Sequence, residues 1–499
     1  MSLSRRTTIL RSTLLLTLAN FAMRGVSMVF QVYLTGQVGA AGIGLLQLIL
    51  TVNGFAVTLG TSGIRVASMY LSAEEYGLRR FHGVRSAMCW CLGAGLLLSA
   101  LVGFLMFLSA DLLALHWVKD LRAAASLRLL GLTLPLTCSG AILGGYFTAC
   151  GKIGRFVIVE ILDRLASAGL TMYLLARGAV GDLSYACTAI IGGSALASFG
   201  STILLLAMLW LDFRKLPVSD EPLNMGRRLI RFCVPVALND YLRSGLGTLE
   251  QFLIPYGLSR SGSSRTTALA DYGTIHGMVF PVMMFPCTVL YAVADLLVPR
   301  LARCMAEKNH RRTQFLIRHT LRLGTVFAAA VGGFLFVLSE PLGQLLYHST
   351  DAARYLRLFA PLVPILYLDC IVDGMHKGLG QQIYCVRVNT LTNLMDVIFL
   401  YLLLPRFGIG GYLFTYTLTH VINFYLSVRK LLQLTDFRPD LRFLLCAAIS
   451  VVAVSAFLCL YVPVKNHWTG VLIRGGLYLI LLTMLLTLTG TVDKPRKNL

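Results

Sequence analysis

The sequence predicts an all-α polytopic membrane protein, and three observations support that prediction. The chain of 499 residues is 56% hydrophobic and only 13% charged, whereas a soluble domain carries roughly 25% charged residues. Apolar runs of about 20 residues, the length that crosses a bilayer, recur along the whole chain. The two halves of the chain also resemble each other, which is typical of transporters.

About 14 apolar segments are long enough to cross a bilayer as helices. The loops between them are short, so we expect no folded extramembrane domain. The predicted spans lie at roughly 9–34, 42–69, 86–109, 126–149, 154–176, 184–211, 229–257, 270–298, 320–346, 355–376, 385–405, 409–434, 441–463 and 469–490.

The basic residues predict the orientation in the membrane. The formal net charge is +21, and the basic side chains gather in the alternate loops that share a side with the N-terminus. By the positive-inside rule, both termini are expected in the cytoplasm, which also requires an even number of spans. This distribution accounts for the high charge without a nucleic-acid partner.

An internal repeat divides the chain. The segment 126–135 resembles the segment 355–364, and Gly151-Lys152 corresponds to Gly380-Gln381. In both pairs the two copies are separated by the same number of residues along the chain, which we call the repeat offset. At other spacings, 20–24 resembles 239–243, and Ala73-Glu74 with Arg79-Arg80 resembles Ala306-Glu307 with Arg311-Arg312. The alternative is chance similarity between leucine-rich helices. The order of all four pairs is preserved, which favours duplication.

The repeat predicts two lobes of six helices each. Residues 1–215 would form the N-terminal lobe, residues 216–436 the C-terminal lobe, and residues 437–499 two further helices with a short cytoplasmic tail. Both lobes would begin in the cytoplasm, so the repeat is parallel rather than inverted.

Two predicted spans contain central arginines. The first span places Asn20, Arg24 and Gln31 on one helix face, and the seventh carries Asn239 together with Asp240, Arg243 and Glu250. An arginine at the bilayer centre costs about 2.5–3.5 kcal/mol on insertion scales. We therefore predict a hydrated cavity shared by the lobes. The alternative is structural pairing, with Asp240 neutralising Arg243 and another acid neutralising Arg24.

Charged residues also occur in the fifth span. Glu160, Asp163 and Arg164 lie three or four residues apart and share a helix face. Either Glu160 and Arg164 form a local ion pair, or the carboxylates bind a coupling proton or sodium ion beside the cavity. Asp240 and Glu250 are further candidates for ion coupling. Asp369 and Asp373 lie near His376 and Lys377 on the tenth span, and interfacial pairing is the favoured interpretation.

Enzyme signatures are not found in the sequence. There is no Walker loop, no His-Glu-x-x-His and no Gly-x-Ser-x-Gly, and no pair of histidines has metal-ligand spacing. We expect no catalytic residue, metal or cofactor.

Several motifs resemble a known superfamily of membrane transporters. They are Gly42–Gln47, Gly63–Ala67, Ala270–Pro281, Leu297–Ala302, Lys377–Gly380 and Leu404–Gly411. Together they resemble the polysaccharide-exporter branch, and most closely the stage V sporulation protein B-like group, of the multidrug/oligosaccharidyl-lipid/polysaccharide (MOP) flippase superfamily. The resemblance extends over nearly the whole chain.

The resemblance implies two six-helix bundles facing each other in a V, with two extra helices. It implies a monomer in the bacterial cytoplasmic membrane that moves undecaprenyl-pyrophosphate-linked sugars, such as peptidoglycan precursors, by alternating access. Arg24, Arg164 and Arg243 would then bind the phosphates, with Asn20, Gln31 and Asn239 lining the cavity. Relatives carry a pair of basic residues on the first span, whereas this chain has Arg24 and Gln31 there.

Two other functions remain open. A multidrug extruder of the same superfamily would export organic cations, which favours acid-rich cavities without central arginines. An intramembrane enzyme, such as a saccharide polymerase, usually has a sizeable external loop, and none is predicted here.

Overall fold

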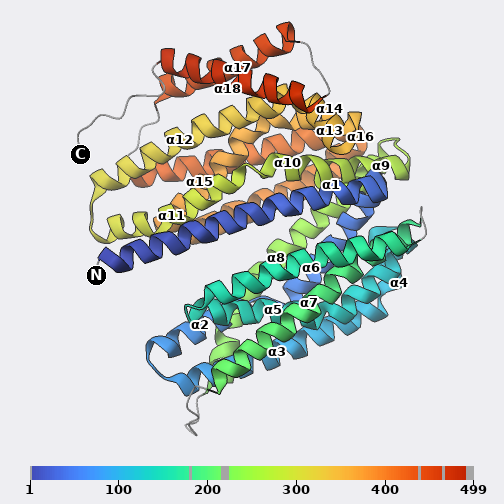
Figure 1. The fold of residues 1–499 in the computed structure, drawn as a ribbon, viewed down its shortest axis with the longest axis vertical. Helices are drawn as coiled ribbons and strands as arrows, with labels where there is room; N and C mark the ends of the chain where they lie inside the picture. Colours follow the sequence, from blue (N-terminus) through green and yellow to red (C-terminus); the bar gives the residue numbers. More distant parts are fainter. Residues whose placement is uncertain (1–2, 179–181, 215–223, 436–439, 463–466, 490–499) are drawn as a thin grey trace. The chain divides into compact units, whose positions relative to one another are not determined.

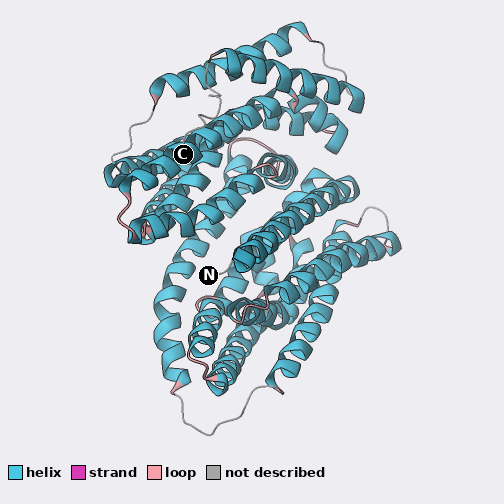
Figure 2. Ribbon diagram, turned by 60° about the vertical axis from the view of Figure 1, so that its left-hand side comes forward, coloured by secondary structure: helices cyan, strands magenta, loops and turns pink. Residues whose placement is uncertain are grey.

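A computed structural model describes residues 3–178, 182–214, 224–435, 440–462 and 467–489, with side chains from Phe21 onward except Leu441. Helices account for almost all of this part, which contains no strand (Figure 2). The chain divides into two compact units. The first unit comprises Met1–Leu16 and Gly42–Leu253, and the second comprises Thr17–Ala41 and Ile254–Leu499.

The first unit is a helical bundle around a core of aliphatic and aromatic side chains that includes Ile64, Met88, Ile142 and Tyr146. Small residues allow close helix packing, since Gly103 and Gly131 face each other on α3 and α5. Its helices are the second part of α1 (Leu3–Thr61), α2 (Ile64–Gly77), α3 (Phe81–Leu108), α4 (Ala110–Leu113), η1 (Ala114–Val118), η2 (Leu121–Ala123), α5 (Ala124–Ala149), α6 (Ile153–Arg177), α7 (Leu183–Phe213) and most of α8 (Met225–Arg260).

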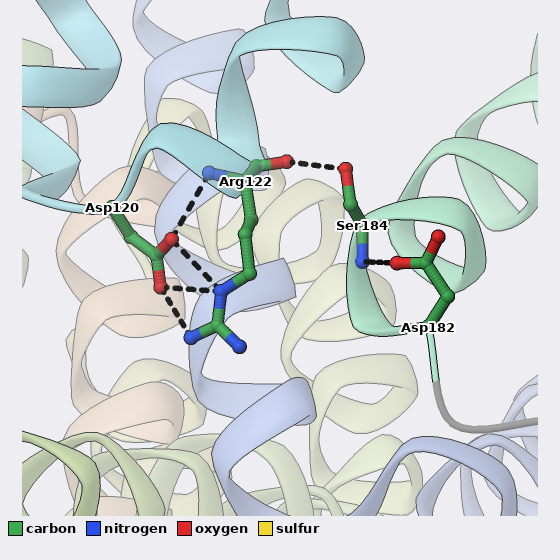
Figure 3. A network of polar contacts seen from close by, with 4 residues as sticks. All are labelled: Asp120, Arg122, Asp182 and Ser184. Atoms are coloured by element: carbon green, nitrogen blue, oxygen red, sulfur yellow. Dashed lines mark hydrogen bonds and ion pairs between the residues drawn. The ribbon is translucent and has the colours of Figure 1, made fainter.

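Polar side chains fix the start of α7 and the short helix η2 that leads into α5 (Figure 3). Asp182 caps α7 by accepting from the backbone N–H of Ser184 at 3.0 Å. Ser184 donates from Oγ to the carbonyl oxygen of Arg122 at 3.2 Å. Arg122 in turn forms an ion pair with Asp120, with Nη2 2.7 Å from Oδ2. Two helices distant in sequence therefore begin at the same level.

The second unit contains residues 17–41 of α1, the end of α8 and all helices after α8 (Figure 1). A separate apolar cluster, which includes Val337, Leu458 and Tyr478, joins its last two helices to α12. The elements are α9 (Arg265–Gly273), η3 (Thr274–Val279), α10 (Phe280–Met284), α11 (Cys287–Ala306), α12 (His310–Val337), α13 (Ser339–Tyr347), α14 (Thr350–Phe359), η4 (Ala360–Leu362), α15 (Val363–Gly378), α16 (Gln382–Thr435), α17 (Leu441–Tyr461) and α18 (Trp468–Leu488).

Each of the two longest helices contains a glycine with a positive φ that breaks its regular geometry, Gly39 at 70° in α1 and Gly408 at 56° in α16. In α16 the two arms fold back on each other. Thr419 donates to Asp396 at 2.6 Å and Asn423 donates to Asn389 at 2.8 Å. Glycine adopts a left-handed φ without steric cost, so α16 corresponds to the two predicted spans 385–405 and 409–434.

Nine helices in the described part are long and apolar enough to cross a bilayer, or ten if the bent pair Arg265–Met284 and Cys287–Ala306 is one span. The polytopic all-α class is confirmed. Two of the nine helices contain the breaks at Gly39 and Gly408, and α6 and α8, which carry charged candidate residues, are not among the nine. The figure of 14 spans is approximate.

The structure repeats itself at the repeat offset found in the sequence, the spacing that separates Gly151 from Gly380. Residues with left-handed φ occur in pairs at this spacing: Arg79 and Lys308, Lys119 and His348, Gly151 and Gly380. Close helix approaches repeat in the same way. A side chain at Gly95 would meet Ile142, and one at Gly324 would meet Ile371. The duplication is therefore present in the turns and in the packing.

One predicted alignment within the repeat is wrong. The sequence comparison paired Arg79-Arg80 with Arg311-Arg312, but the structure pairs Arg80 with Asn309, because these residues precede α3 and α12 as their N-caps. Matching the two copies by charge shifted their alignment by a few residues, whereas the turn geometry gives the correct register.

The division into units differs from the predicted lobes in two segments. Residues 17–41 belong to the second unit, and residues up to Leu253, including most of α8, belong to the first. The predicted lobe boundaries after residues 215 and 436 stay a prediction.

Gly63 supplies a first testable prediction. Its φ is 76°, and a Cβ at this position would lie 2.6 Å from the carbonyl oxygen of Cys233 on α8. Gly63→Ala should destabilise the protein by roughly 2–4 kcal/mol, because strain at positive φ and steric overlap add together. The measurement is the apparent melting temperature in detergent. Gly54→Ala is the control, since nothing lies within 4 Å of its added Cβ, and an equal loss in both variants would contradict the prediction.

Candidate functional site

Arg24 is an exposed residue in the first part of α1. Its guanidinium carbon lies 5.5 Å from the ring centroid of Tyr291 on α11. One turn earlier, the rings of Phe21 and Phe285 are 5.1 Å apart. Two turns later, Gln31 donates from Nε2 to the carbonyl oxygen of Gly277 at 3.0 Å. These contacts hold the first part of α1 against the second unit and keep Gln31 engaged with backbone.

Arg24 has no carboxylate within ion-pair distance in the described part of the chain. Tyr291 interacts electrostatically with both Arg24 and Asp369, which lies on α15. The pairing of Arg24 with an unidentified acid, which the sequence left open, is therefore not formed within 4 Å by any residue that the structure describes. The positive charge of Arg24 is stabilised by an aromatic face instead.

Arg243 is exposed on α8 and likewise makes no ion pair among the described residues. Asp240, three residues earlier, accepts a hydrogen bond from Ser62 at 2.8 Å. Two further bonds run between the same helices, from Tyr241 to the carbonyl oxygen of Leu59 at 3.1 Å and between Ser244 and Thr58 at 3.2 Å.

Asp240 and Arg243 therefore form no direct ion pair within 4 Å among the described residues, and the carboxylate of Asp240 accepts from Ser62 instead. Asn239 is half-buried beside Asp240, and Glu250 is half-buried with a contact inside the protein.

Arg164 pairs with Glu160 at 3.2 Å, one turn apart on α6. The side chains are 51% and 44% exposed, so the pair is weak in water and open to exchange for another anion. Asp163 is separate from this pair and accepts from Ser201 on α7 at 2.8 Å. The local ion pair predicted as one alternative is present, and the phosphate-binding role of Arg164 stays a prediction.

The remaining predicted cavity residues cannot all be placed in one site. The side chain of Asn20 lies outside the described residues. Arg24 belongs to the second unit, and Arg164 and Arg243 belong to the first. Their convergence on one cavity stays a prediction.

The structure draws attention to a pair of carboxylates on α15 for which the sequence favoured only interfacial pairing. Asp369 and Asp373 are one turn apart, and each has a buried Oδ1 atom without a hydrogen-bond partner in the described part. His376 is fully buried and its Nδ1 lies 3.0 Å from the carbonyl oxygen of Val372. The predicted ion pairs with His376 and Lys377 are not formed within 4 Å among the described residues. The sequence signal for this carboxylate pair is the presence of two acidic residues four positions apart in an apolar run.

Most of the chain matches a known family. Residues 9–305, more than half of the chain, match the family model described as polysaccharide biosynthesis protein. The chain belongs to the polysaccharide biosynthesis protein family. Residues 261–402 of this family member also match the model described as MatE.

Curated relatives and solved structures agree with the membership. Stage V sporulation protein B of Bacillus subtilis (strain 168) is 21% identical over 417 residues, which cover 81% of this chain and 80% of the relative. The lipid II flippase MurJ in an inward closed conformation superposes with a TM-score of 0.74 at 13% identity, covering 96% of this chain and 99% of that one. An inward-facing multidrug resistance MATE family transporter of the MOP superfamily has a TM-score of 0.66 at 13% identity, covering 84% and 96%.

The family match and the curated relative confirm the resemblance to polysaccharide biosynthesis proteins of the stage V sporulation protein B kind. The solved structures confirm the fold, a polytopic helical protein with the architecture of MurJ and MATE transporters. The similar proteins whose names print an activity are transporters or flippases.

Proposed function

We propose that this protein is a flippase for lipid-linked saccharide precursors that works by alternating access. The observation behind the proposal is that two arginines, Arg24 on α1 and Arg243 on α8, have no carboxylate partner within 4 Å in the described part. The sequence predicts both near the middle of a span, where a charge is expensive and marks a binding pathway by default. Membership of the polysaccharide biosynthesis protein family supports the same assignment.

The chemistry of the substrate suits these side chains. A polyprenyl pyrophosphate carries several negative charges, and arginine binds phosphate through two parallel hydrogen bonds. Arg24 and Arg243 would hold the pyrophosphate, while Asn20, Gln31 and Asn239 offer amides to the sugar hydroxyls. Arg164 would join them by exchanging Glu160 for a substrate oxygen. Undecaprenyl-pyrophosphate-linked sugars, including peptidoglycan precursors, are the proposed substrate class.

Ion coupling is the second part of the proposal. Among the candidates from the sequence, Asp163 and Asp240 each accept from a serine, and Glu160 is paired with Arg164. Asp369 and Asp373 are better placed, because their unpartnered buried oxygens need a proton or a small cation to be stable in apolar surroundings. A proton or sodium ion bound there would change the charge beside Arg24 during the cycle.

The location is part of the same proposal. We place the protein as a monomer in a bacterial cytoplasmic membrane with both termini in the cytoplasm, because basic residues gather in the loops on that side. A role in cell-wall or spore-cortex assembly is consistent with the similarity to stage V sporulation protein B.

A multidrug extruder is the second candidate. The MatE model matches residues 261–402, the region that includes the Asp369 and Asp373 pair. Organic cations would be attracted by these acids, whereas the unpaired arginines would repel them. The arginines therefore favour the anionic lipid substrate.

Reconstitution into liposomes distinguishes the two functions. The purified protein is assayed with a fluorescent polyprenyl-pyrophosphate sugar and, separately, with a cationic dye, with and without an imposed proton or sodium gradient. We expect leaflet transfer of the lipid, accelerated by one of the gradients, and no accumulation of the dye. Dye transport without lipid transfer would reverse the assignment.

A further inference from the structure

A cavity of about 610 Å³ lies where α12 ends and the short helices α13 and α14 begin. Figure 1 shows α13 and α14 together at one end of α12. The volume is in the range that accommodates a small-molecule head group. The lining residues are Phe336, Ser339, Glu340, Gln344, Thr350, Ala353, Arg354, Arg357, Leu358 and Pro361.

The polar side of this cavity is dominated by two arginines. Arg354 and Arg357 lie three residues apart on α14, so they share a helix face. The guanidinium carbon of Arg357 is 5.1 Å from the ring centroid of Phe336, a contact that orients the guanidinium without neutralising it. Neither arginine forms an ion pair within 4 Å among the described residues, although Glu340 lines the same cavity.

The internal repeat provides a comparison inside the same molecule. At the repeat offset, Arg357 corresponds to Arg128 and Glu340 corresponds to Asp111. In the first unit these two counterparts form an ion pair at 2.5 Å. In the second unit Arg357 and Glu340 remain apart, and the position of Ala125 is occupied by a second arginine, Arg354. The first copy is internally neutralised. In the second, Arg357 forms no ion pair with Glu340, and Arg354 interacts electrostatically with Asp271 without an ion pair within 4 Å among the described residues.

We propose that this cavity binds a lipid head group that carries both a phosphate and free hydroxyls. Arg354 and Arg357 would bind the phosphate oxygens, as paired guanidinium groups do. Glu340 and Gln344 would accept hydrogen bonds from the hydroxyls, and Phe336 would contact the apolar part of the lipid. Phosphatidylglycerol and a polyprenyl-diphosphate sugar share this chemistry.

The cavity faces the outer leaflet if the predicted orientation holds. It lies at the end of α12 opposite His310, and the segment around His310 is rich in basic residues, which the positive-inside rule places in the cytoplasm. Binding of a head group in this cavity requires no transport step, so the binding proposal can be tested independently of the proposed flippase activity.

Binding to the purified full-length protein in detergent tests the proposal. The probes are short-chain phosphatidylglycerol, short-chain phosphatidylcholine, a short-chain polyprenyl-diphosphate sugar and inorganic phosphate. The variants are Arg354→Gln with Arg357→Gln, Arg354→Lys with Arg357→Lys, and the repeat-matched control Arg128→Gln. Each variant is first checked for an unchanged melting temperature.

We expect a hydroxyl-bearing lipid to bind more tightly than phosphatidylcholine. The double glutamine variant should lose roughly tenfold or more in affinity, because two charged hydrogen-bond donors are removed. The double lysine variant should retain part of the wild-type affinity, and Arg128→Gln should retain all of it. Preference for phosphatidylglycerol supports a resident phospholipid, and preference for the diphosphate sugar supports the transported lipid.

Equal binding by wild type and the double glutamine variant would overturn the proposal, as would equal affinity for phosphatidylcholine. If the glutamine variant is unstable, the lysine variant still tests the proposal. A stable lysine variant should prefer hydroxyl-bearing lipids over phosphatidylcholine. Loss of that preference would also contradict the assigned contacts.

Discussion

Arg24→Ala and Arg243→Ala are each expected to reduce the rate of lipid transfer by roughly tenfold to a hundredfold. Each substitution removes charged hydrogen bonds to a phosphate, which are worth about 1.5–3 kcal/mol. The double variant should be inactive. The measurement is the initial rate of transfer of a fluorescent polyprenyl-pyrophosphate sugar in proteoliposomes, with reconstituted protein quantified in every sample.

Two further variants separate binding from charge alone. Arg260→Ala removes a positive charge from the last turn of α8, the same helix that carries Arg243, and should leave transfer unchanged. Arg243→Lys retains the charge but loses the bidentate geometry, so an intermediate rate is expected. Normal transfer by both alanine variants would remove these arginines from the substrate pathway.

Arg228→Gln is expected to destabilise the first unit by about 3–5 kcal/mol. Arg228 lies in the first turn of α8 and forms ion pairs with Glu74 at 2.9 Å and with Glu75 at 2.7 Å on α2. Glu75 is fully buried, and its Oε2 atom has no partner in the described part. Removal of Arg228 leaves a buried carboxylate without a counterion, and thermal unfolding in detergent measures the loss.

The chain contains a matched control and a suppressor for this prediction. Arg227→Gln removes the neighbouring arginine, for which no ion pair is seen in the described part, and should have little effect on the melting temperature. Combining Glu75→Gln with Arg228→Gln should recover most of the stability, because the uncompensated charge is then absent. A double variant as unstable as Arg228→Gln alone would show that the buried carboxylate is not the cause.

Local patterns correctly predicted one contact among the candidate residues. Glu160 and Arg164 are four residues apart on one helix, and the expected pairing is present because helical periodicity alone brings them together. Arg24 and Arg243 were also recognised from sequence, because a charge inside an apolar run needs a special environment. Their relationship across the two units is not encoded in any local pattern.

The amino-acid sequence was sufficient to predict the membrane class, the helical character and the existence of a duplication, because these follow from composition, hydrophobic length and order along the chain. The partners of the polar side chains follow from tertiary packing. Asp240 binds Ser62, 178 residues away, rather than the nearby Arg243, and Arg228 pairs with two acids on α2 that are 153 and 154 residues away. Helical periodicity specifies which side chains share a face, but it does not specify which helix that face will meet.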